Sequence, residues 1–122
     1  MYTVRHLLQE KGNQIWSVAP QATAYEALEL MAAKNIGSLV VIENGNVAGV
    51  FTERDYARKV VLKGRSSKTT AVSDLMTTEV LYVNPDDTIV YCMALMSDKH
   101  LRLLLVMDND KLAGIVSIGD IV

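Results

Sequence analysis

The sequence is poor in the residues that build disulfide frameworks, metal centres and catalytic dyads. It contains one cysteine, two histidines and two prolines among 122 residues. A single cysteine excludes an intrachain disulfide, and we expect a reducing, cytoplasmic location. His6, His100 and Cys92 do not have metal-ligand spacing, so no metal site is predicted. No nucleophile is accompanied by a credible general base, and the sequence therefore indicates no enzyme.

Long apolar runs and a strong net charge are also missing. Half of the residues are hydrophobic, but no run approaches the roughly 18 residues that span a bilayer, and the N-terminus lacks a signal-peptide pattern. The formal charge of −2 favours neither a nucleic acid nor an anionic membrane as a partner. We therefore expect a soluble protein of about one domain, which can bury roughly two-thirds of its unfolded surface.

What the sequence does contain is an internal duplication. Residues 15–57 align with residues 80–122 without a gap, at an offset of 65, with 12 identities in 43 positions. The duplication is clearest where residues 49–55, with the sequence GVFTERD, recur as residues 114–120, GIVSIGD. A repeat of about 55 residues is marginally stable alone. We therefore expect the two repeats to share one core about a pseudo-twofold axis.

Each repeat has the pattern β-α-β-β-α, which predicts an α/β fold of the α+β type. In repeat 1, a short strand at 15–18 precedes a helix that begins at the capping box Thr23-x-x-Glu26. An Asn-Gly turn at 44–45 predicts a hairpin, and a second helix is expected from Glu53 to about Leu62. The helices carry core stripes at positions Ala24, Ala27, Leu28 and Met31, and at Ile89, Cys92, Met93 and Met96.

The predicted boundaries follow the repeats. Residues 1–64 form repeat 1 with a lead-in helix, 65–71 form a polar linker, and 72–122 form repeat 2. The lead-in segments align at an offset of 68, so repeat 1 has three extra residues around Gly12. Repeat 2 lacks most of its last helix, because only two residues follow Asp120. Its apolar surface would then lack an intrachain partner, which predicts a homodimer.

The opening pattern Val-x-Pro-x-x-Thr, at 18–23 and 83–88, and the closing pattern Gly-h-x-Ser/Thr-x-x-Asp, with h apolar, resemble those of the cystathionine-β-synthase (CBS) domain family. Two such repeats form a Bateman module, and the chain is most similar to stand-alone bacterial members. The resemblance implies a regulatory module that binds an adenosyl compound between the repeats: AMP, ADP, ATP, NAD or S-adenosylmethionine. It also implies a homodimer, signalling to an unidentified regulated protein, and no obligatory cofactor.

The resemblance further implies two clefts with residues from both repeats. The first joins Thr52 and Asp55 to Thr77, Val80, Tyr82 and Arg102. The second joins Ser117 and Asp120 to Gln9, Ile15, Trp16 and Gly37. A carboxylate such as that of Asp55 suits the vicinal hydroxyls of a ribose, and Arg54 and Arg58 lie on the same predicted helix. Arg102 is replaced by Gly37 in the second cleft, so the first is expected to prefer phosphorylated ligands.

Plainer interpretations of the same residues stay open. Both Ser/Thr-x-x-Asp motifs fit a helix capping box, which would be a purely structural role. The six Lys and Arg residues between 54 and 68 fit a solvated helix face as well as a phosphate site. The chain could therefore be an interaction or dimerisation module that binds no ligand.

Overall fold

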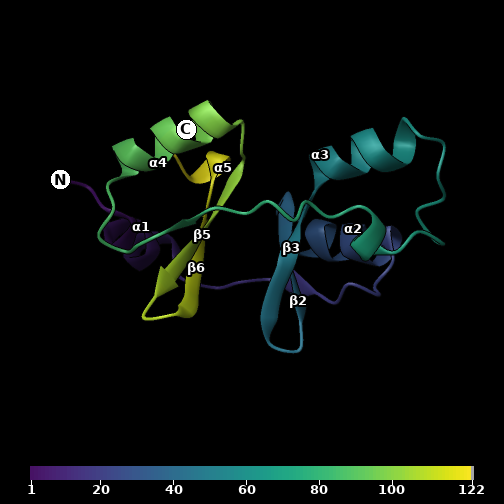
Figure 1. Cartoon of the computed structure of the whole chain (residues 1–122), viewed down its shortest axis with the longest axis horizontal. Helices are drawn as coiled ribbons and strands as arrows, with labels where there is room; N and C mark the ends of the chain where they lie inside the picture. The colour runs from purple at the N-terminus through teal and green to yellow at the C-terminus, as the bar shows by residue number, and fades with distance from the viewer. Residues whose placement is uncertain (122) are drawn as a thin grey trace. The chain divides into compact units, whose positions relative to one another are not determined.

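The computed structural model describes residues 1–121. The chain forms two compact units, one made of residues 1–15 together with the chain from Val80 onward, and one made of Trp16–Glu79. Figure 1 shows the helices and strands of each unit along the coloured chain. The mixed α/β fold and its organisation in two repeats are confirmed. None of the helices within residues 1–121 has the length and apolar composition of a membrane span.

The unit of residues 16–79 contains a three-stranded sheet with the order β1-β2-β3. Strand β1 is parallel to β2, and β2 is antiparallel to β3. Its elements are β1 (Ser17–Val18), α2 (Ala24–Lys34), β2 (Ser38–Glu43), β3 (Asn46–Thr52), α3 (Glu53–Tyr56), the π-helical turn η1 (Ala57–Val61) and the 3₁₀ turn η2 (Val72–Asp74).

The other unit repeats this arrangement with the sheet β4-β5-β6, in which β4 is parallel to β5 and β5 is antiparallel to β6. Its elements are α1 (Val4–Lys11), β4 (Tyr82–Val83), α4 (Ile89–Lys99), β5 (Leu103–Asp108), β6 (Lys111–Ser117) and α5 (Ile118–Ile121). Both hairpins shift register at equivalent places, after Val41 and after Val106. The duplication therefore extends to an irregularity of the backbone.

Each unit contains a hydrophobic cluster of buried residues, and the expectation of one core shared by the two repeats stays a prediction. Each lead-in segment completes the cluster of the other repeat. Val4 and Leu7 of α1 lie in the cluster of repeat 2, and Val72 and Leu75 lie in that of repeat 1. A helix and a lead-in segment therefore cover the sheet of each repeat.

Two local predictions need correction, and the predicted linker has contacts that the sequence did not indicate. Met93 was expected on the core stripe of α4 but is 49% exposed, whereas Cys92 and Met96 are buried. The second helix of repeat 1 is α-helical only to Tyr56 and continues as a π-helical turn, in which Leu62 N donates to Ala57 O. The segment at 65–71 is held against the start of α2, where backbone carbonyls of Ser67 and Thr70 accept hydrogen bonds.

Candidate ligand-binding site

Thr52 and Asp55 are positioned by the end of β3 and the start of α3. Thr52 has an extended backbone, with φ −122°, and its hydroxyl accepts a hydrogen bond from Asp55 N at 3.0 Å. Asp55 Oδ2 accepts in return from Thr52 N at 3.0 Å and from Thr52 Oγ1 at 3.1 Å. The capping box expected under the structural interpretation is therefore present, with Asp instead of Glu at its third position.

The other carboxylate oxygen of Asp55 has partners that capping does not require. Thr77 Oγ1 donates to Asp55 Oδ1 at 3.1 Å, and Lys59 Nζ lies 3.1 Å from the same oxygen. Lys59 Nζ also donates to the carbonyl oxygen of Leu75 at 2.8 Å. An ionised carboxylate has about four acceptor positions, and Asp55 has four donors around it. A ribose hydroxyl can bind Asp55 only by displacing one of them.

A second capping box in the same unit shows what capping alone looks like. Thr23 and Glu26 at the start of α2 make the same reciprocal hydrogen bonds, at 2.9 to 3.1 Å. These bonds from the backbone and side chain of Thr23 lower the pKa of Glu26, which is exposed. Asp55, at 9% exposure, is the only charged residue buried within residues 1–121. Its burial and its contacts at Oδ1 thus distinguish it from a cap.

The corresponding motif of repeat 2 has a different partner from the one predicted. Asp120 Oδ2 accepts from Ser117 N at 2.8 Å and from Lys11 Nζ at 2.6 Å. Burial acts to raise the pKa of Asp120, but the hydrogen bonds from Lys11 and Ser117 outweigh it and hold the pKa below its ordinary value. Sequence reasoning missed Lys11, which lies in the stretch around Gly12 where repeat 1 has its three extra residues.

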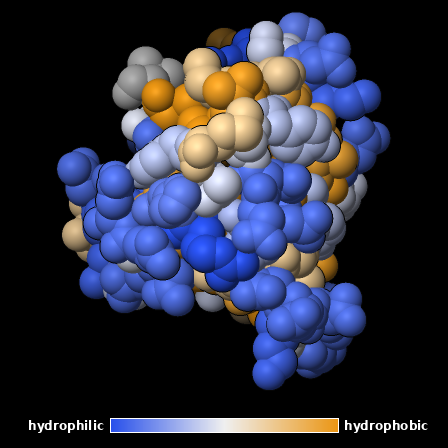
Figure 2. Space-filling view, turned by 90° about the vertical axis from the view of Figure 1, so that its left-hand side faces the viewer, coloured by the Kyte–Doolittle hydropathy of each residue, from blue (hydrophilic) through white to orange (hydrophobic). Residues whose placement is uncertain are grey.

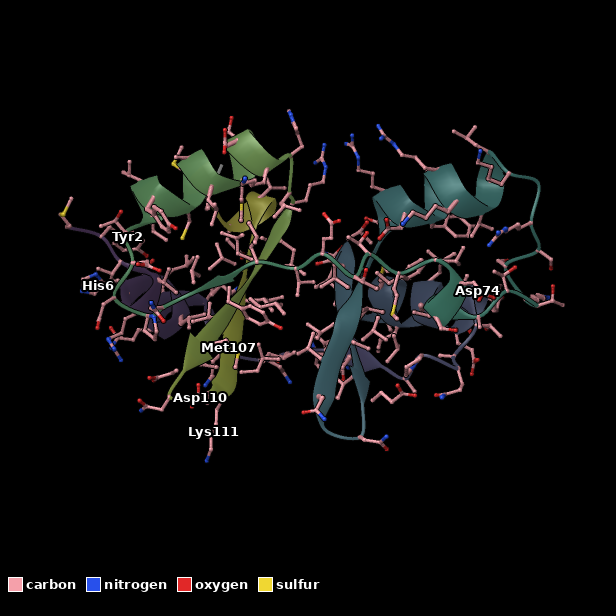
Figure 3. The ribbon with its side chains drawn as sticks, in the orientation of Figure 1. Tyr2, His6, Asp74, Met107, Asp110 and Lys111 are labelled. Atoms are coloured by element: carbon pink, nitrogen blue, oxygen red, sulfur yellow. The ribbon has the colours of Figure 1, made fainter. Side chains whose placement is uncertain are left out.

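Gln9 was expected near Asp120, but no hydrogen bond joins these two residues within residues 1–121. Gln9 lines a shallow cavity of about 440 Å³ together with Met1, Tyr2, His6 and Glu10. The rings of Tyr2 and His6 stack there, with centroids 5.6 Å apart, at the N-terminal end labelled in Figure 3.

Gly37 and Arg102 occupy equivalent places, each in its own unit. The carbonyl oxygen of Gly37 accepts from Glu53 N at 3.0 Å, and that of Arg102 accepts from Ile118 N at 2.9 Å. Each residue therefore lies beside the start of the helix that carries the aspartate of its own repeat. A Cβ on Gly37 would lie only 2.7 Å from Glu53 Oε1.

The remaining predicted residues are divided between the units. Arg54 and Arg58 are exposed in the unit of Asp55, where Trp16 is half-buried with Lys34 Nζ 4.2 Å from its ring centroid. In the other unit, Tyr82 is exposed, and Ile15 and Val80 are half-buried. The structure thus brings Thr52, Asp55 and Thr77 together, and Ser117 with Asp120. The predicted combination of residues from both units stays a prediction.

Comparison with known proteins identifies the repeats. The profile of the CBS domain matches residues 4–62 and 72–122. The Arabidopsis thaliana protein named "CBS domain-containing protein CBSX3, mitochondrial" is 38% identical over 130 residues, covering 98% of this chain. "CBS domain-containing protein YhcV" of Bacillus subtilis is 36% identical over 108 residues, covering 88% of this chain and 76% of that protein.

A solved structure of a protein with CBS domains from Burkholderia ambifaria MC40-6 is 48% identical, with a TM-score of 0.94 over 98% of this chain and 90% of that one. The chain spans 63% of the length of the Arabidopsis protein. The two matched segments and these relatives cover both repeats. The chain belongs to the CBS-domain family.

Proposed function

We propose that the chain is a regulatory module that binds an adenosyl compound, with the ribose at Asp55. The observation that carries the proposal is the buried carboxylate of Asp55, whose Oδ1 is met by the hydroxyl of Thr77. A ribose hydroxyl is a like-for-like replacement for a threonine hydroxyl at this oxygen. The capping bonds at Oδ2 can remain during the exchange and keep the carboxylate in place.

The class of ligand is supported by the chemistry of the motif and by a structure with the same fold. A CBS domain pair of protein MJ0100, 20% identical with a TM-score of 0.84, was solved in complex with 5′-methylthioadenosine and S-adenosyl-L-methionine. That fold therefore accommodates adenosyl compounds. For this chain we propose AMP, ADP, ATP, NAD or S-adenosylmethionine, with Arg54, Arg58 and Arg102 as partners for phosphate groups where the ligand has them.

The output we propose is regulation of another protein rather than catalysis, and we keep the cytoplasm as the proposed location. We also propose that the chain is a homodimer. On α4, Val90 and Tyr91 are exposed beside Met93. Figure 2 shows apolar side chains gathered near the top of the face formed by the unit that contains α4. A protein 29% identical to the chain, the CBS-CP12 protein from bloom-forming cyanobacteria, is a hexamer.

A ligand-free interaction module is the second candidate function. It is favoured by the complete set of donors around Asp55, because a fully satisfied carboxylate needs no ligand. The two functions differ in one measurable property, which is the affinity for adenosyl compounds.

A thermal-shift screen against the five named compounds tests the proposal. A compound that binds only the folded state stabilises it by about 2.7 kcal/mol at a hundredfold excess over its Kd. We expect at least one compound to raise the Tm and calorimetry to confirm its binding. GMP, which differs from AMP only in its base, is the control for the adenine. No shift with any of the five would favour the ligand-free module.

A further inference from the structure

The first turn of α1 is closed by His6, one of the two histidines of the chain. Thr3 N donates a hydrogen bond to His6 Nδ1 at 3.1 Å, and His6 N donates in return to Thr3 Oγ1 at 3.4 Å. This is a capping box with histidine at the position that glutamate or glutamine usually occupies. Histidine changes its charge between pH 5 and 8, so this cap depends on the protonation state of one ring.

The turn that His6 caps is also the part of α1 that attaches to repeat 2. Val4 N and Arg5 N donate to the carbonyl oxygens of Asp87 and Pro85, at 2.9 and 2.8 Å. The side chain of Val4 is fully buried in the hydrophobic cluster of that repeat. Loss of the cap therefore acts on a turn whose backbone and side chains complete the cluster of repeat 2.

The equivalent turn in the lead-in segment of repeat 2 has similar backbone contacts but a different cap. Val72 N donates to the carbonyl oxygen of Ala22 at 2.7 Å. Ala71 is at the N-cap position there, and within residues 1–121 no side chain caps the turn. Asp74 takes the place of His6 at the offset of 68, and Figure 3 labels both residues. The histidine cap is thus an addition that makes one lead-in segment sensitive to protonation.

On its cavity side, His6 lies beside three other groups that titrate, which are the amino group of Met1, the hydroxyl of Tyr2 and the carboxylate of Glu10. Hydrogen bonding to Glu10 raises the pKa of Tyr2, so this carboxylate already has a partner. Within the part of the chain that the structure describes, no carboxylate forms a salt bridge with His6. Glu10 is exposed and one turn away, so its attraction for a charged ring is worth about twofold at most.

The acidic residues on the segment that α1 packs against also have partners of their own. Asp86 pairs with Arg5 at 3.1 Å, and Asp87 Oδ2 accepts a hydrogen bond from Asn84 N at 2.7 Å. A positive charge on His6 would therefore gain little from these carboxylates. It would also stand in the first turn of a helix, where the helix dipole disfavours cations.

We propose that His6 is a pH-sensitive switch, which holds the first turn of α1 on repeat 2 while its ring is neutral and loosens it when the ring is protonated. A neutral ring whose Nδ1 accepts from Thr3 N carries its hydrogen on Nε2. Protonation adds a hydrogen to Nδ1, and Thr3 N then loses its acceptor. Thr3 Oγ1, 3.1 Å from Nδ1, can accept the new hydrogen but does not replace the lost bond. The cap is therefore complete above about pH 6.5 and is lost as the pH falls through this range.

Urea denaturation at pH 7.5 and pH 5.5 tests the switch in the wild type, His6→Gln and His100→Asn. Glutamine is a usual partner in a capping box and does not titrate. We expect acidification to raise the unfolding constant of the wild type about two- to fivefold more than that of His6→Gln. His100→Asn is the matched control, because His100 ends α4 in the left-handed conformation that asparagine also adopts. This control should follow the wild type. Equal pH dependence of His6→Gln and the wild type would overturn the inference, as would loss of the dependence in His100→Asn.

Nuclear magnetic resonance of the wild-type chain gives a second test that requires no variant to fold. The nitrogen resonances of the His6 ring should show its hydrogen on Nε2 at pH 7.5. The amide resonance of Thr3 should shift together with the titration of this ring, because its acceptor is lost. A hydrogen on Nδ1 at pH 7.5, or a Thr3 amide that does not respond to the titration, would show that His6 is no switch. Neither test depends on an adenosyl compound, so the inference stands or fails separately from the proposed function.

Discussion

Val50 and Thr77 exchange two backbone hydrogen bonds, from Thr77 N to Val50 O at 2.8 Å and from Val50 N to Thr77 O at 2.9 Å. This short antiparallel contact is what places the Thr77 hydroxyl on Asp55 Oδ1. The approach is possible because Gly49 precedes Val50. A Cβ at Gly49 would lie 2.6 Å from the carbonyl oxygen of Thr77, which is closer than atoms can approach.

Gly49→Ala should therefore destabilise the fold and displace Thr77. The clash is with backbone, so we expect a loss of about 1–3 kcal/mol, as for other overpacked sites, measured by urea denaturation. Gly114→Ala is the matched control, because its Cβ would meet side-chain atoms of Leu8 at 2.9 Å. A leucine side chain can change rotamer, so the control should lose less stability. An equal or larger loss for Gly114→Ala would contradict this account.

The sequence predicted the elements of each repeat because local signals are strong there. The Asn-Gly turn, the Thr-x-x-Glu box and the apolar strand at 38–42 each indicate one structure without help from distant residues. The pairing of Thr77 with Asp55 was also predicted, but only because the resemblance to the family supplied it. Nothing in the spacing of these residues, 22 positions apart, indicates their contact.

What the sequence could not predict depends on contacts between distant segments. The sequence has no signal for the exchange by which each lead-in segment completes the hydrophobic cluster of the other repeat. Lys59 belonged to a basic run that fits a solvated face, yet it lies on Asp55 and Leu75. Lys11 lies beside an insertion with no counterpart in repeat 2, so comparing the repeats could not assign it a role. Met93 follows the core period of α4, but that face of the helix is not covered within the unit.

The Lys11–Asp120 pair should make stability depend on pH in the acid range. The pKa of Asp120 is lower in the folded protein than its ordinary value near 3.8. Stability from this group is therefore present above that ordinary value and is lost as the pH falls through the lower pKa of the folded state. Lys11→Met should lower the free energy of unfolding by about 1 kcal/mol or less at pH 7. The difference in this free energy between the variant and the wild type should become smaller in acid.

Urea denaturation of both proteins at neutral pH and through the acid range measures this difference. Arg5→Met is the control, because the ion pair of Arg5 with Asp86 is exposed and should contribute little. A difference between wild type and Lys11→Met that stays constant down to the lowest pH would show that Lys11 acts through packing instead of through the charge of Asp120.

Cys92 should be unreactive in the folded protein. Burial, with a smaller contribution from the negative charge of Asp87, raises its pKa to about 11 from an ordinary value of 9.0. At pH 8 we expect thiol reagents to modify the unfolded protein at least about a hundredfold faster than the native one. The raised pKa means that the folded protein favours the neutral thiol of Cys92. The stability that comes from this preference is present below pH 9 and is lost as the pH rises toward 11. Comparable native and unfolded rates would contradict the burial of Cys92.

The proposed homodimer should be sensitive to charge on α4. Val90 is 73% exposed, so Val90→Glu should leave the fold of a single chain intact while placing a charge in an apolar contact. We expect light scattering at micromolar concentration to give a dimer mass for the wild type and a monomer mass for this variant. Val61→Glu, at 58% exposure on η1, is the control and should stay dimeric. A monomer mass for the wild type would refute the dimer. A dimer mass for the wild type and for both variants would refute the role of α4.

Asp55→Ala separates a ligand-binding carboxylate from a helix cap, because the same unit contains a cap for comparison. The substitution removes four hydrogen-bond or ion-pair contacts from a buried group. It should lower the free energy of unfolding by about 1–3 kcal/mol. It should also weaken the binding of the adenosyl compound found in the screen at least about tenfold, through the loss of charged hydrogen bonds.

Glu26→Ala removes the equivalent group from the Thr23 box, where the carboxylate is exposed and makes no contact beyond its own cap within residues 1–121. This variant should lose some helix stability and bind the compound as the wild type does. Affinity is to be measured by calorimetry at a temperature where both variants are folded. Equal affinity for Asp55→Ala and Glu26→Ala would reduce the Thr52–Asp55 motif to a cap and leave the ligand-free module as the better account of the chain.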